Sequence, residues 1–433
     1  MKAKILNTYQ KYDSYKDSDV DWVGDIPSDW EVVPLRTIFK FRNENNRPVI
    51  TEDILSLSIA NGVTKYSDSN RGGNKRKDDI TAYKIARPND IVLNSMNVVA
   101  GAVGVSRYFG AISPVYYALY IHDETSVLEY YSWVFQNQIF QRNLLKYGKG
   151  ILIKFGEFGK MNTVRMKISQ HDMKTLVFPK PSVENQKKIA KFLNRKSGQI
   201  DQAINLKQQQ IEKLNEYKQI TIQNAVTKGL NANAKMKDSG IDWMGDIPKH
   251  WEVISLRYLF DFLNKDRVPI SADERGGMQG IYPYYGASGI IDYVNDYIFD
   301  EKLILIAEDG ANLLSKSTPL AFIAEGKYWV NNHAHILKPK YEGFEFWAKL
   351  LSLCDYTVYI TGAAQPKLSR GNLGNVLLPV PPAEEMLAIS KKLEQDLPRY
   401  FDAAKRFKAQ IERLKEYKTI LINQAVTGKI KVS

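Results

Sequence analysis

The sequence has a single cysteine, Cys354, and only five histidines among its 433 residues. One cysteine cannot form an internal disulfide and cannot supply a zinc site built from several cysteines. No run of about 18 apolar residues occurs, so no membrane-spanning helix is expected. The N-terminal residues contain no apolar core of signal-peptide length. Together these absences predict a cytoplasmic protein with no membrane segment.

Motifs of nucleotide-binding and methyl-transferring enzymes are also missing. The sequence has no Gly-x-x-x-x-Gly-Lys-[Ser/Thr] run, whose backbone would cradle phosphates, and no Gly-x-Gly-x-x-Gly after a predicted strand. It has no Asn-Pro-Pro-Tyr or Asp-Pro-Pro-Tyr run, which an adenine methyltransferase similar to known ones would need. The sequence therefore gives no support for ATP binding by a P-loop or for an adenine methyltransferase site.

Positive charge is present in excess, with 60 Lys and Arg against 48 Asp and Glu and a formal net charge of +12. The hydrophobic content of 44% and the charged content of 25% are ordinary for a soluble globular protein. A positive charge of this size favours a polyanionic partner, and nucleic acid is the first candidate. A basic protein that is merely soluble is the alternative.

The most informative feature is a motif that occurs twice. Residues 17–32 place Trp22 and Trp30 on either side of Gly-Asp-Ile-Pro, and residues 238–253 place Trp243 and Trp251 around the same four residues. The two copies align position by position without a gap, which indicates a duplicated chain with at least two domains. Because tryptophan buries a large area and the motif holds little chemistry, we expect these side chains to be packing anchors.

A second repeat closes each half. Residues 211–220 match residues 411–420, and both stretches continue to Ala-Val-Thr. The offset here is shorter than that of the tryptophan motif, so the first variable region is longer than the second. Both stretches follow proline-rich turns and have apolar residues near heptad spacing, which predicts long helices that form a coiled coil.

A break is predicted inside each of these helices, at Ser197-Gly198 in the first and at 396–398 in the second. A Ser or Asp there can cap a new helix. From the first break to Thr227, roughly 28 residues span about 42 Å at 1.5 Å per residue. Because one turn of B-DNA is about 34 Å, such a helix can separate two reading domains by one turn. If the two helices pack antiparallel, an approximate two-fold axis relates the halves.

The regions between the repeats, 37–178 and 258–378, have the pattern of short strands separated by turns. The predicted strands are 90–94, 115–121, 303–307 and 328–337, the last with a polar insert. Residues 129–145 are predicted as helix and residues 281–289 as an aromatic, glycine-rich loop. The expected fold class is α+β. The two regions barely align, although the motifs at their ends are shared. This is expected if both regions perform the same task on two different targets.

The paired Trp-x-Gly-x-Ile-Pro-x-x-Trp-Glu-Val motifs resemble those of the specificity subunits of type I restriction-modification systems. The Pro-x-Pro turns and the helices that end Glu-Tyr-Lys…Ala-Val-Thr resemble them too. The turn before each helix departs mildly from the family's usual Glu-Gln, with Glu184-Asn185-Gln186 and Glu384-Glu385-Met386. The resemblance covers essentially the whole chain. It implies an N-terminal arm (1–16), a first target recognition domain (17–180), a helical spacer (181–229), a linker (230–237), a second target recognition domain (238–380) and a second helical spacer (381–433).

The resemblance also implies a function. Such a subunit is not catalytic; it reads a bipartite asymmetric DNA target, one half per domain, and recruits two methyltransferase subunits, which endonuclease/translocase subunits then join. S-adenosylmethionine, ATP and Mg would be bound by those partner subunits. The two long antiparallel helices would separate the recognition domains and dock the methyltransferase subunits, and the candidate partner-binding residues are Ile211, Leu214, Tyr217, Ile411, Leu414 and Tyr417.

Candidate DNA contacts are exposed cations for phosphates and polar loop residues for base edges. In the first domain they are Arg71, Lys75, Arg76, Lys77, Asn97, Arg107 and Lys149. In the second domain they are Tyr284, Tyr285, Lys316, Asn331, Asn332, His333, Gln365, Lys367 and Arg370. For any one basic residue the alternative is a solvated surface charge. His333 and His335 lie two apart on a predicted strand, but two histidines without a third ligand are weak support for a metal, and base contact or packing is expected.

Two other classes of function remain open on the sequence alone. One is a stand-alone DNA-binding regulator or half of a fused restriction enzyme, which the absence of a neighbouring methyltransferase gene would favour. The other is a scaffold or coiled-coil protein that binds no DNA. The net charge and the divergent strand-rich regions argue against the scaffold.

Overall fold

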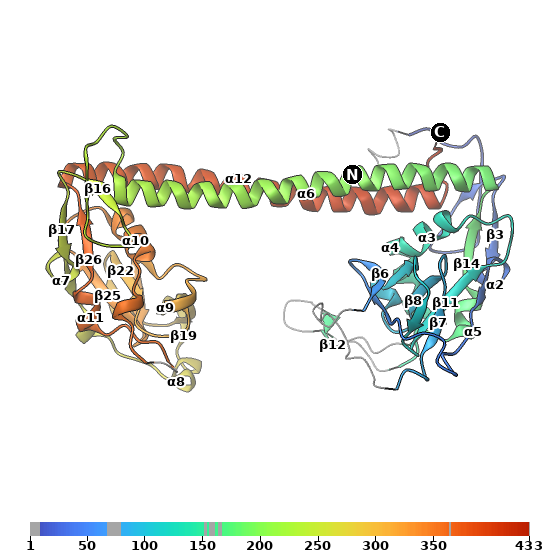
Figure 1. Ribbon diagram of the computed structural model, residues 1–433, viewed down its shortest axis with the longest axis horizontal. Coiled ribbons are helices and arrows are strands. Elements are labelled where there is room, and N and C mark those ends of the chain that lie inside the picture. Colours follow the sequence, from blue (N-terminus) through green and yellow to red (C-terminus); the bar gives the residue numbers. More distant parts are fainter. Residues whose placement is uncertain are drawn as a thin grey trace. The chain divides into compact units, whose positions relative to one another are not determined.

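The computed structural model describes residues 9–66, 79–150, 154–155, 161–162, 167–362 and 365–432. The chain divides into two compact units: unit 1 comprises Met1–Lys207 and Ala409–Ser433, and unit 2 comprises Gln208–Lys408. Two long helices, α6 (Val183–Lys228) and α12 (Ala383–Val426), each contribute a segment to both units (Figure 1). In the described residues no helix is both long enough and apolar enough to span a bilayer.

Unit 1 is organised around an antiparallel sheet in the order β4-β11-β8-β9. Its strands are β4 (Phe39–Phe41), β8 (Ile91–Asn94), β9 (Val103–Val105) and β11 (Tyr116–Ile121). The helices α3 (Leu128–Gln136) and α4 (Gln138–Asn143) lie between this sheet and α6 (Figure 1). The remaining strand pairs are β1 (Tyr15–Lys16) with β2 (Ile26–Pro27), β3 (Glu31–Pro34) with β14 (Val177–Lys180), β5 (Leu55–Ser58) with β6 (Gly62–Lys65), β7 (Lys84–Ala86) with β10 (Gly110–Ile112), and β12 (Lys154–Phe155) with β13 (Met161–Asn162). Short helices are α2 (Leu35–Ile38), η1 (Val98–Ala100), η2 (Leu144–Tyr147) and α5 (Gln170–Thr175).

Unit 2 repeats this plan with a sheet in the order β18-β25-β22-β23 and adds a second sheet, β20-β19-β24-β21. The first sheet consists of β18 (Phe260–Phe262), β22 (Leu303–Ala307), β23 (Ala321–Ala324) and β25 (Ala334–Pro339). The second consists of β19 (Gln279–Gly286), β20 (Gly289–Val294), β21 (Phe299–Asp300) and β24 (Lys327–Val330). The outer pairs are β15 (Met236–Asp238) with β16 (Asp246–Pro248) and β17 (Glu252–Ser255) with β26 (Leu377–Val380). The shorter helices are α7 (Leu256–Leu259), η3 (Asn264–Asp266), α8 (Ala272–Gly276), α9 (Asn312–Ser315), α10 (Phe344–Leu353), η4 (Thr357–Tyr359) and α11 (Arg370–Gly374).

The internal repeat is visible in the register of the two main sheets. Ile91 of β8 pairs with Leu119 of β11, and Ile304 of β22 pairs with Leu337 of β25. In each unit the strand that follows the tryptophan motif pairs with the strand that precedes a long helix, β3 with β14 and β17 with β26. The predicted α+β fold with two strand-rich regions and an internal repeat is therefore confirmed.

The tryptophans of the repeated motif are packing anchors, as predicted. Trp30 and Trp251 are completely buried, Trp22 is almost so, and Trp243 is partly buried against the core of unit 2. Trp30 joins the core of unit 1 together with Ile26, whereas Trp251 joins the core of unit 2. Burying an aromatic side chain of this size contributes several kcal/mol, on the order of the 3–5 kcal/mol lost when one is cut to alanine.

The predicted breaks in the long helices are wrong. Both α6 and α12 are continuous, with Gly198 and Pro398 in their interiors. The Ser197 hydroxyl is buried without a hydrogen-bond partner among the described residues, so it does not cap a new helix. Glycine costs a helix only about 1 kcal/mol, and the apolar residues on both sides, such as Leu193 and Ile200, are buried in the core of unit 1. Tertiary packing therefore outweighs the local signal, and α6 has 46 residues.

The two long helices run antiparallel, as predicted. In unit 1 the Lys418 ammonium donates to both oxygens of Asp201, at 2.7 and 2.8 Å. In unit 2 the hydroxyls of Thr221 and Tyr400 lie 3.0 Å apart. As the residue number rises along α6, the number of its partner on α12 falls.

The N-terminal arm completes unit 1. Tyr15 of β1 pairs with Pro27, just as Met236 of β15 pairs with Pro248 in unit 2. The amide of Lys431, beyond the end of α12, donates to the carbonyl of Gln10 at 2.7 Å. Part of the arm therefore lies next to the segment that follows α12. It takes the place that residues 229–235, which follow α6 directly in the chain, take in unit 2.

Several local predictions are confirmed and others need correction. The strands predicted at 90–94, 115–121 and 303–307 are present as β8, β11 and β22. The predicted loop at 281–289 is instead a hairpin of β19 and β20. The segment 328–337 is two strands, β24 and β25, and its polar insert is the turn between them. The predicted helix 129–145 is interrupted at Asn137, whose side chain caps α4.

Candidate nucleic-acid interface

Equivalent loops meet at the same end of the main sheet in both units. In unit 1, Ile168 donates its amide to the carbonyl of Ser95, directly after β8, at 3.0 Å. In unit 2, Leu368 donates to the carbonyl of Glu308, directly after β22, at 2.8 Å. We call the first set of loops site 1 (residues 95–101, 149–150 and 167) and the second set site 2 (residues 308–316, 331–333, 361–362 and 365–367).

A side chain of the central strand supports each site in the same way. The Tyr117 hydroxyl of β11 donates to the carbonyl of Ile168 at 3.1 Å. His335 occupies the equivalent place on β25, and its Nε2 lies 2.7 Å from the carbonyl of Leu368. A tyrosine and a histidine thus perform one structural task in the two units. Ser169 and Ser369 follow immediately and cap the helices α5 and α11.

Site 2 rests on a partly buried network of charges. Glu308 accepts from the Arg267 guanidinium at 2.7 Å and lies 3.4 Å from the Lys367 ammonium. Burial alone would raise the pKa of Glu308, but the Arg267 hydrogen bond and the positive charges around it hold that pKa below its usual value. Arg267 also donates to the carbonyls of Asn332 and Ala334 at 3.1 and 2.7 Å. Arg267 therefore ties the loop after β22 to the turn before β25.

The buried His335 is a packing residue of this network. Burial lowers the pKa of its imidazole, against the opposing effect of the Leu368 carbonyl. The ring is therefore neutral at pH 7, and its Nε2–H donates to Leu368. Its Nδ1 then accepts from the Asn264 amide at 2.7 Å. Of the two roles expected for His335, packing is the one the structure supports.

The exposed end of site 2 is the turn between β24 and β25. The imidazole Nδ1 of His333 lies 2.8 Å from the Asp309 carboxylate, and about half of that side chain is exposed. Asn332 is exposed beside it, whereas Asn331 is buried and accepts from the His333 amide at 2.8 Å. Asn331 thus shapes the turn that presents Asn332 and His333.

Four other candidates of unit 2 have exposed side chains. Gln365, Lys367 and Arg370 are exposed, with the Arg370 guanidinium 5.3 Å from the centre of the Phe262 ring. Lys316 is exposed but donates to the carbonyl of Cys354 at 2.9 Å.

The two tyrosines of β19 differ from each other. Tyr285 is half-buried beside Phe322. Tyr284 is completely buried, and its hydroxyl lies within hydrogen-bond distance of the backbone of Ile270. The structure therefore corrects the choice of Tyr284, because a nucleic acid cannot reach its side chain in this conformation.

In unit 1 the described candidates are all exposed. Asn97 lies at the start of η1, and Lys149 lies 3.7 Å from Asp172 while pairing through its backbone with Lys167. Arg107 lines a hollow of about 560 Å³ between the β5–β6 hairpin and β9, and this hollow borders site 1 at Gly101. Arg71, Lys75, Arg76 and Lys77 lie outside the described residues.

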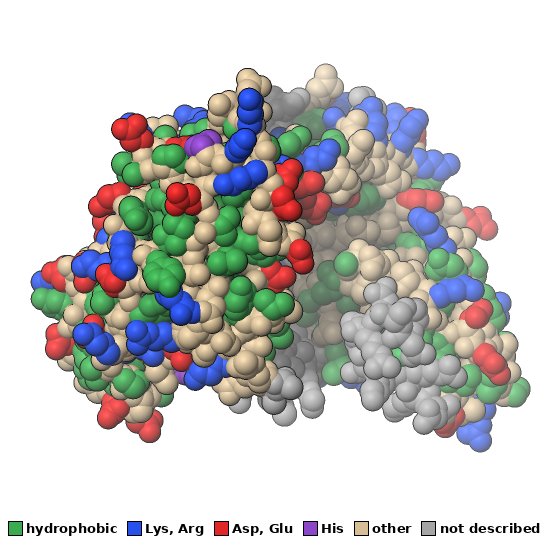
Figure 2. Space-filling model, turned by 60° about the vertical axis from the view of Figure 1, so that its left-hand side comes forward, with side chains coloured by type: hydrophobic (Ala, Val, Ile, Leu, Met, Phe, Trp, Pro, Cys, Tyr) green, Lys and Arg blue, Asp and Glu red, His purple; other side chains and the backbone are tan. Residues whose placement is uncertain are grey.

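Surface charge alone does not locate the interface of unit 2. Figure 2 turns that unit toward the viewer and shows Lys and Arg side chains interspersed with Asp and Glu. Arg267, Asn264, Glu308 and Asp309, which hold site 2 together, were not among the residues predicted from the sequence. A detectable signal existed for the two carboxylates, because Glu308 and Asp309 directly follow the fully buried strand β22. In the described part of the chain, no three His, Cys, Asp or Glu side chains are grouped so that they could hold a metal.

Substituting Arg267 tests how site 2 is held. We expect Arg267→Ala to destabilise the protein by about 3 kcal/mol, because it leaves the Glu308 carboxylate partly buried without its strongest partner. Since the pKa of Glu308 is lowered in the folded protein, its contribution to stability is present above its usual pKa and is lost as the pH falls. Urea unfolding at pH 7 and pH 4 measures both effects, and the variant should lose less at pH 4. The double variant Arg267→Ala/Glu308→Gln is the control and should recover part of the loss; no recovery would contradict the electrostatic explanation.

Residues 27–216 and 248–413 match the model of the type I restriction modification DNA specificity domain, once in each half of the chain. This chain belongs to that family. It is 25% identical to the putative type I restriction enzyme MjaX specificity subunit of Methanocaldococcus jannaschii over 448 aligned positions, which cover 99% of both chains. It is 24% identical to the MjaVIII specificity subunit of the same organism, with 94% of both chains covered.

Solved structures show the same fold. A chain from a structure of type I restriction-modification complex assembly has a TM-score of 0.66 and 14% identity, covering 93% of this chain and 98% of that one. The specificity subunit HsdS of Thermoanaerobacter tengcongensis has a TM-score of 0.53, also with 14% identity, and covers 94% and 98%. Membership of the type I specificity family, which the two repeated motifs predicted, is thus confirmed over most of the chain.

Proposed function

We propose that this type I specificity subunit reads a bipartite asymmetric DNA target, with each strand-rich region contacting one half. The observation that carries this proposal is that sites 1 and 2 share one backbone framework and differ in side chains. Ser95-Met96-Asn97 in unit 1 stands where Glu308-Asp309-Gly310 stands in unit 2, by the register of β8 and β22. A duplicated framework with different polar ends is suited to recognising two unlike sequences.

The proposed contacts are the exposed side chains at these ends. Asn97 and Lys149 belong to site 1, and Asn332, His333, Gln365 and Lys367 belong to site 2. Asparagine and glutamine can each form two hydrogen bonds with adenine in the major groove, and lysine can contact guanine or phosphates. Arg107, Tyr285 and Arg370 are proposed as secondary contacts because they lie outside these loops, and Lys316 is placed with them because its ammonium donates to the carbonyl of Cys354. Tyr284 and Asn331 act by shaping the backbone.

The long helices carry the remaining part of the proposal. They keep the two recognition regions at a fixed spacing and dock methyltransferase subunits, to which endonuclease/translocase subunits add. Catalysis, S-adenosylmethionine, ATP and Mg belong to those partners. Of the six helix residues proposed for docking, Ile411 is buried, four are half-buried, and Tyr217 is 63% exposed. A stand-alone DNA-binding or scaffold role is the alternative proposal.

Methylation mapping by single-molecule sequencing tests the proposal. The chain is expressed with its neighbouring methyltransferase subunit in a host that lacks adenine methylation. We expect methyladenine at one bipartite asymmetric motif, and we expect that methylation to disappear when the gene for this chain is deleted. If both proteins are soluble and co-purify but no motif is methylated, the scaffold alternative is favoured.

A further inference from the structure

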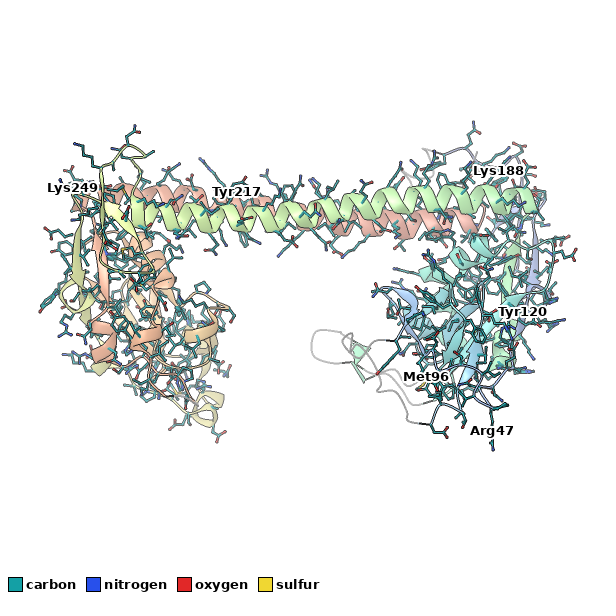
Figure 3. The ribbon with its side chains drawn as sticks, viewed as in Figure 1. Arg47, Met96, Tyr120, Lys188, Tyr217 and Lys249 are labelled. Atoms are coloured by element: carbon teal, nitrogen blue, oxygen red, sulfur yellow. The ribbon has the colours of Figure 1, made fainter. Side chains whose placement is uncertain are left out.

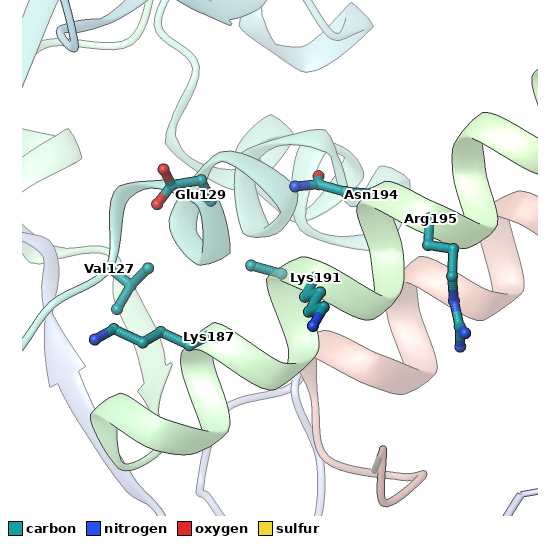
Figure 4. A pocket seen from close by; sticks show the side chains of 7 residues that line it. Val127, Glu129, Lys187, Lys191, Asn194 and Arg195 are labelled. Carbon is teal, nitrogen blue, oxygen red and sulfur yellow. The ribbon is translucent and has the colours of Figure 1, made fainter.

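A groove in unit 1 lies between the start of α3 and one face of α6. It has a volume of about 570 Å³ and is lined by Val127 and Glu129 on one side and by residues of α6 on the other. In Figure 4 the side chains of Lys187, Lys191 and Arg195 extend from successive turns of α6, and Val127 and Glu129 stand on the segment opposite. None of these residues belongs to site 1 or to the docking residues considered above.

The three cations of the groove form a row without carboxylate partners. Lys187, Lys191 and Arg195 are four residues apart, so each step along α6 is about 6 Å. All three side chains are exposed, and among the described residues no ion pair joins any of them to a carboxylate. Their neighbour Lys188, by contrast, pairs with Glu184 at 2.8 Å. Three unpaired cations in a row repel one another, and a ligand with matching negative charges relieves that repulsion.

The walls of the groove are rigid. Asn194 accepts from the indole of Trp133 on α3 at 2.8 Å, which fixes α3 against α6. At the other end the amide of Val127 donates to Gln186 of α6 at 2.8 Å. Ala190 is buried at the base of the groove. The groove is therefore preformed, which lowers the entropy cost of binding.

The equivalent place in unit 2 lacks this row. With the offset of the helix repeat, its residues are Leu387, Lys391 and Gln395. Leu387 is 48% exposed. Residues 183–207 contain six Lys and Arg against two Asp and Glu, a net charge of +4, whereas residues 383–407 contain five of each. The two helix surfaces therefore differ in charge, and a ligand that matches the row of cations in unit 1 does not match the equivalent positions in unit 2.

We propose that the groove lined by Lys187, Lys191 and Arg195 docks an acidic polypeptide segment of a partner protein, with carboxylates at helical spacing. A peptide fits better than DNA for two reasons. The groove has an apolar base formed by Val127 and Ala190, which can accept an aliphatic side chain but offers nothing to a phosphodiester. The exposed Glu129 carboxylate at the rim repels a phosphate chain, whereas a peptide can place a donor or a neutral residue there. This inference does not depend on which DNA target the subunit reads.

The test uses the full chain and a fluorescein-labelled helical peptide of about 17 residues, with glutamate at every fourth position and leucines beside them. Fluorescence anisotropy at 50 mM salt measures its affinity, and a scrambled peptide of the same composition is the control probe. We expect Lys187→Gln/Lys191→Gln/Arg195→Gln to weaken binding at least 10-fold and to reduce its salt dependence. Glu129→Gln should strengthen binding about two-fold.

A matched variant removes the same charge elsewhere on α6. Lys213→Gln/Lys218→Gln/Lys228→Gln also loses three positive charges but lies in unit 2, so we expect it to keep the affinity of the unchanged protein. The proposal is overturned if the peptide does not bind, if the scrambled peptide binds equally well, or if both triple variants lose affinity equally. It is also overturned if the groove variant loses affinity only for a 30-base-pair duplex, because the groove would then be a phosphate site. None of these results depends on methylation, so failure here is distinguishable from failure of the proposed function.

Discussion

Replacing residues 238–379 with the corresponding segment of another type I specificity subunit should change one half of the methylated motif completely and leave the other half unchanged. The physical reason is that each site is built and supported within its own unit. Site 2 and its supports lie between Asn264 and Leu368, and the hydrogen bonds described above for them all lie within unit 2. Site 1 has its own supports, such as the bond from Tyr117 to Ile168.

Both ends of the exchanged segment lie in short strands outside the long helices. It starts at the end of β15 and finishes in β26, the strand that pairs with β17 and leads into α12. The exchange therefore keeps both long helices, so the number of unread bases between the half-sites should also be kept. Methylation mapping of the hybrid measures both results, and exchange of residues 17–180 is the matched control that should alter the opposite half. A hybrid that is soluble and methylates DNA but changes both halves would contradict the assignment of one half-site to each region.

Within site 2, a residue that is exposed for contact lies next to one that supports the backbone. His333 is exposed at its turn, whereas Asn331 holds that turn by accepting from the His333 amide. The unlike roles of these near neighbours were not visible in the sequence, where all of Asn331, Asn332 and His333 had the same polar character. Only the register of β24 and β25 shows which of them face outward.

The same limit explains which parts of the fold could be predicted. Tyr284 and Tyr285 are adjacent on a strand and so point to opposite faces, which puts one in the core and leaves the other half-buried. Because residues 281–289 were predicted as a loop, this alternation could not be used to tell the buried tyrosine from the half-buried one. By contrast, the fully apolar run of β22 and the paired tryptophan motifs are strong local signals, and they predicted the strand and the anchors correctly.

The long helices show a different limit. Gly198 and Pro398 are helix breakers by propensity, but buried residues hold α6 on both sides of Gly198 and hold α12 on the N-terminal side of Pro398. Leu193 and Ile200 on α6 are fully or nearly buried, and so are Ile389 and Leu393 on α12. The core around Leu193 and Ile200 contains residues from Trp22 to Val432, and the core around Ile389 and Leu393 contains residues from Ile222 onward, so no local window of the sequence contains these contacts.

The surfaces of the long helices lead to the second large effect that we expect, on partner docking. Tyr217 and Tyr417 occupy equivalent positions of the helix repeat. In unit 1, Tyr417 is half-buried, with its hydroxyl 3.4 Å from that of Tyr9, and the Tyr9 ring packs edge-on against Phe192 at 5.5 Å. Burial, followed by the hydrogen bond to Tyr417, raises the pKa of Tyr9 to about 12, in keeping with a covered position.

No such cover exists for Tyr217 among the described residues. The residue of unit 2 that corresponds to Tyr9 by the offset of the tryptophan motif is Leu230, which is 47% exposed. Tyr217 itself is 63% exposed on α6 of unit 2 (Figure 3). Tyrosine is enriched among the residues that dominate protein interfaces, so an uncovered tyrosine on a helix that is proposed to dock a partner is the first place to expect such a residue.

We therefore expect Tyr217→Asp to weaken binding of the methyltransferase subunit about 30-fold or more, which corresponds to about 2 kcal/mol for a dominant interface residue. The same change should leave thermal unfolding nearly unaltered, within about 0.5 kcal/mol, because the side chain is exposed in the free chain. Isothermal titration calorimetry with the purified methyltransferase subunit measures the affinity.

Val358→Asp is the matched control, since Val358 is 86% exposed, apolar and far from α6 in sequence. Equal losses in both variants would mean that a new charge on the surface is enough to disturb the complex. An unchanged affinity for Tyr217→Asp would move the docking surface away from this part of α6.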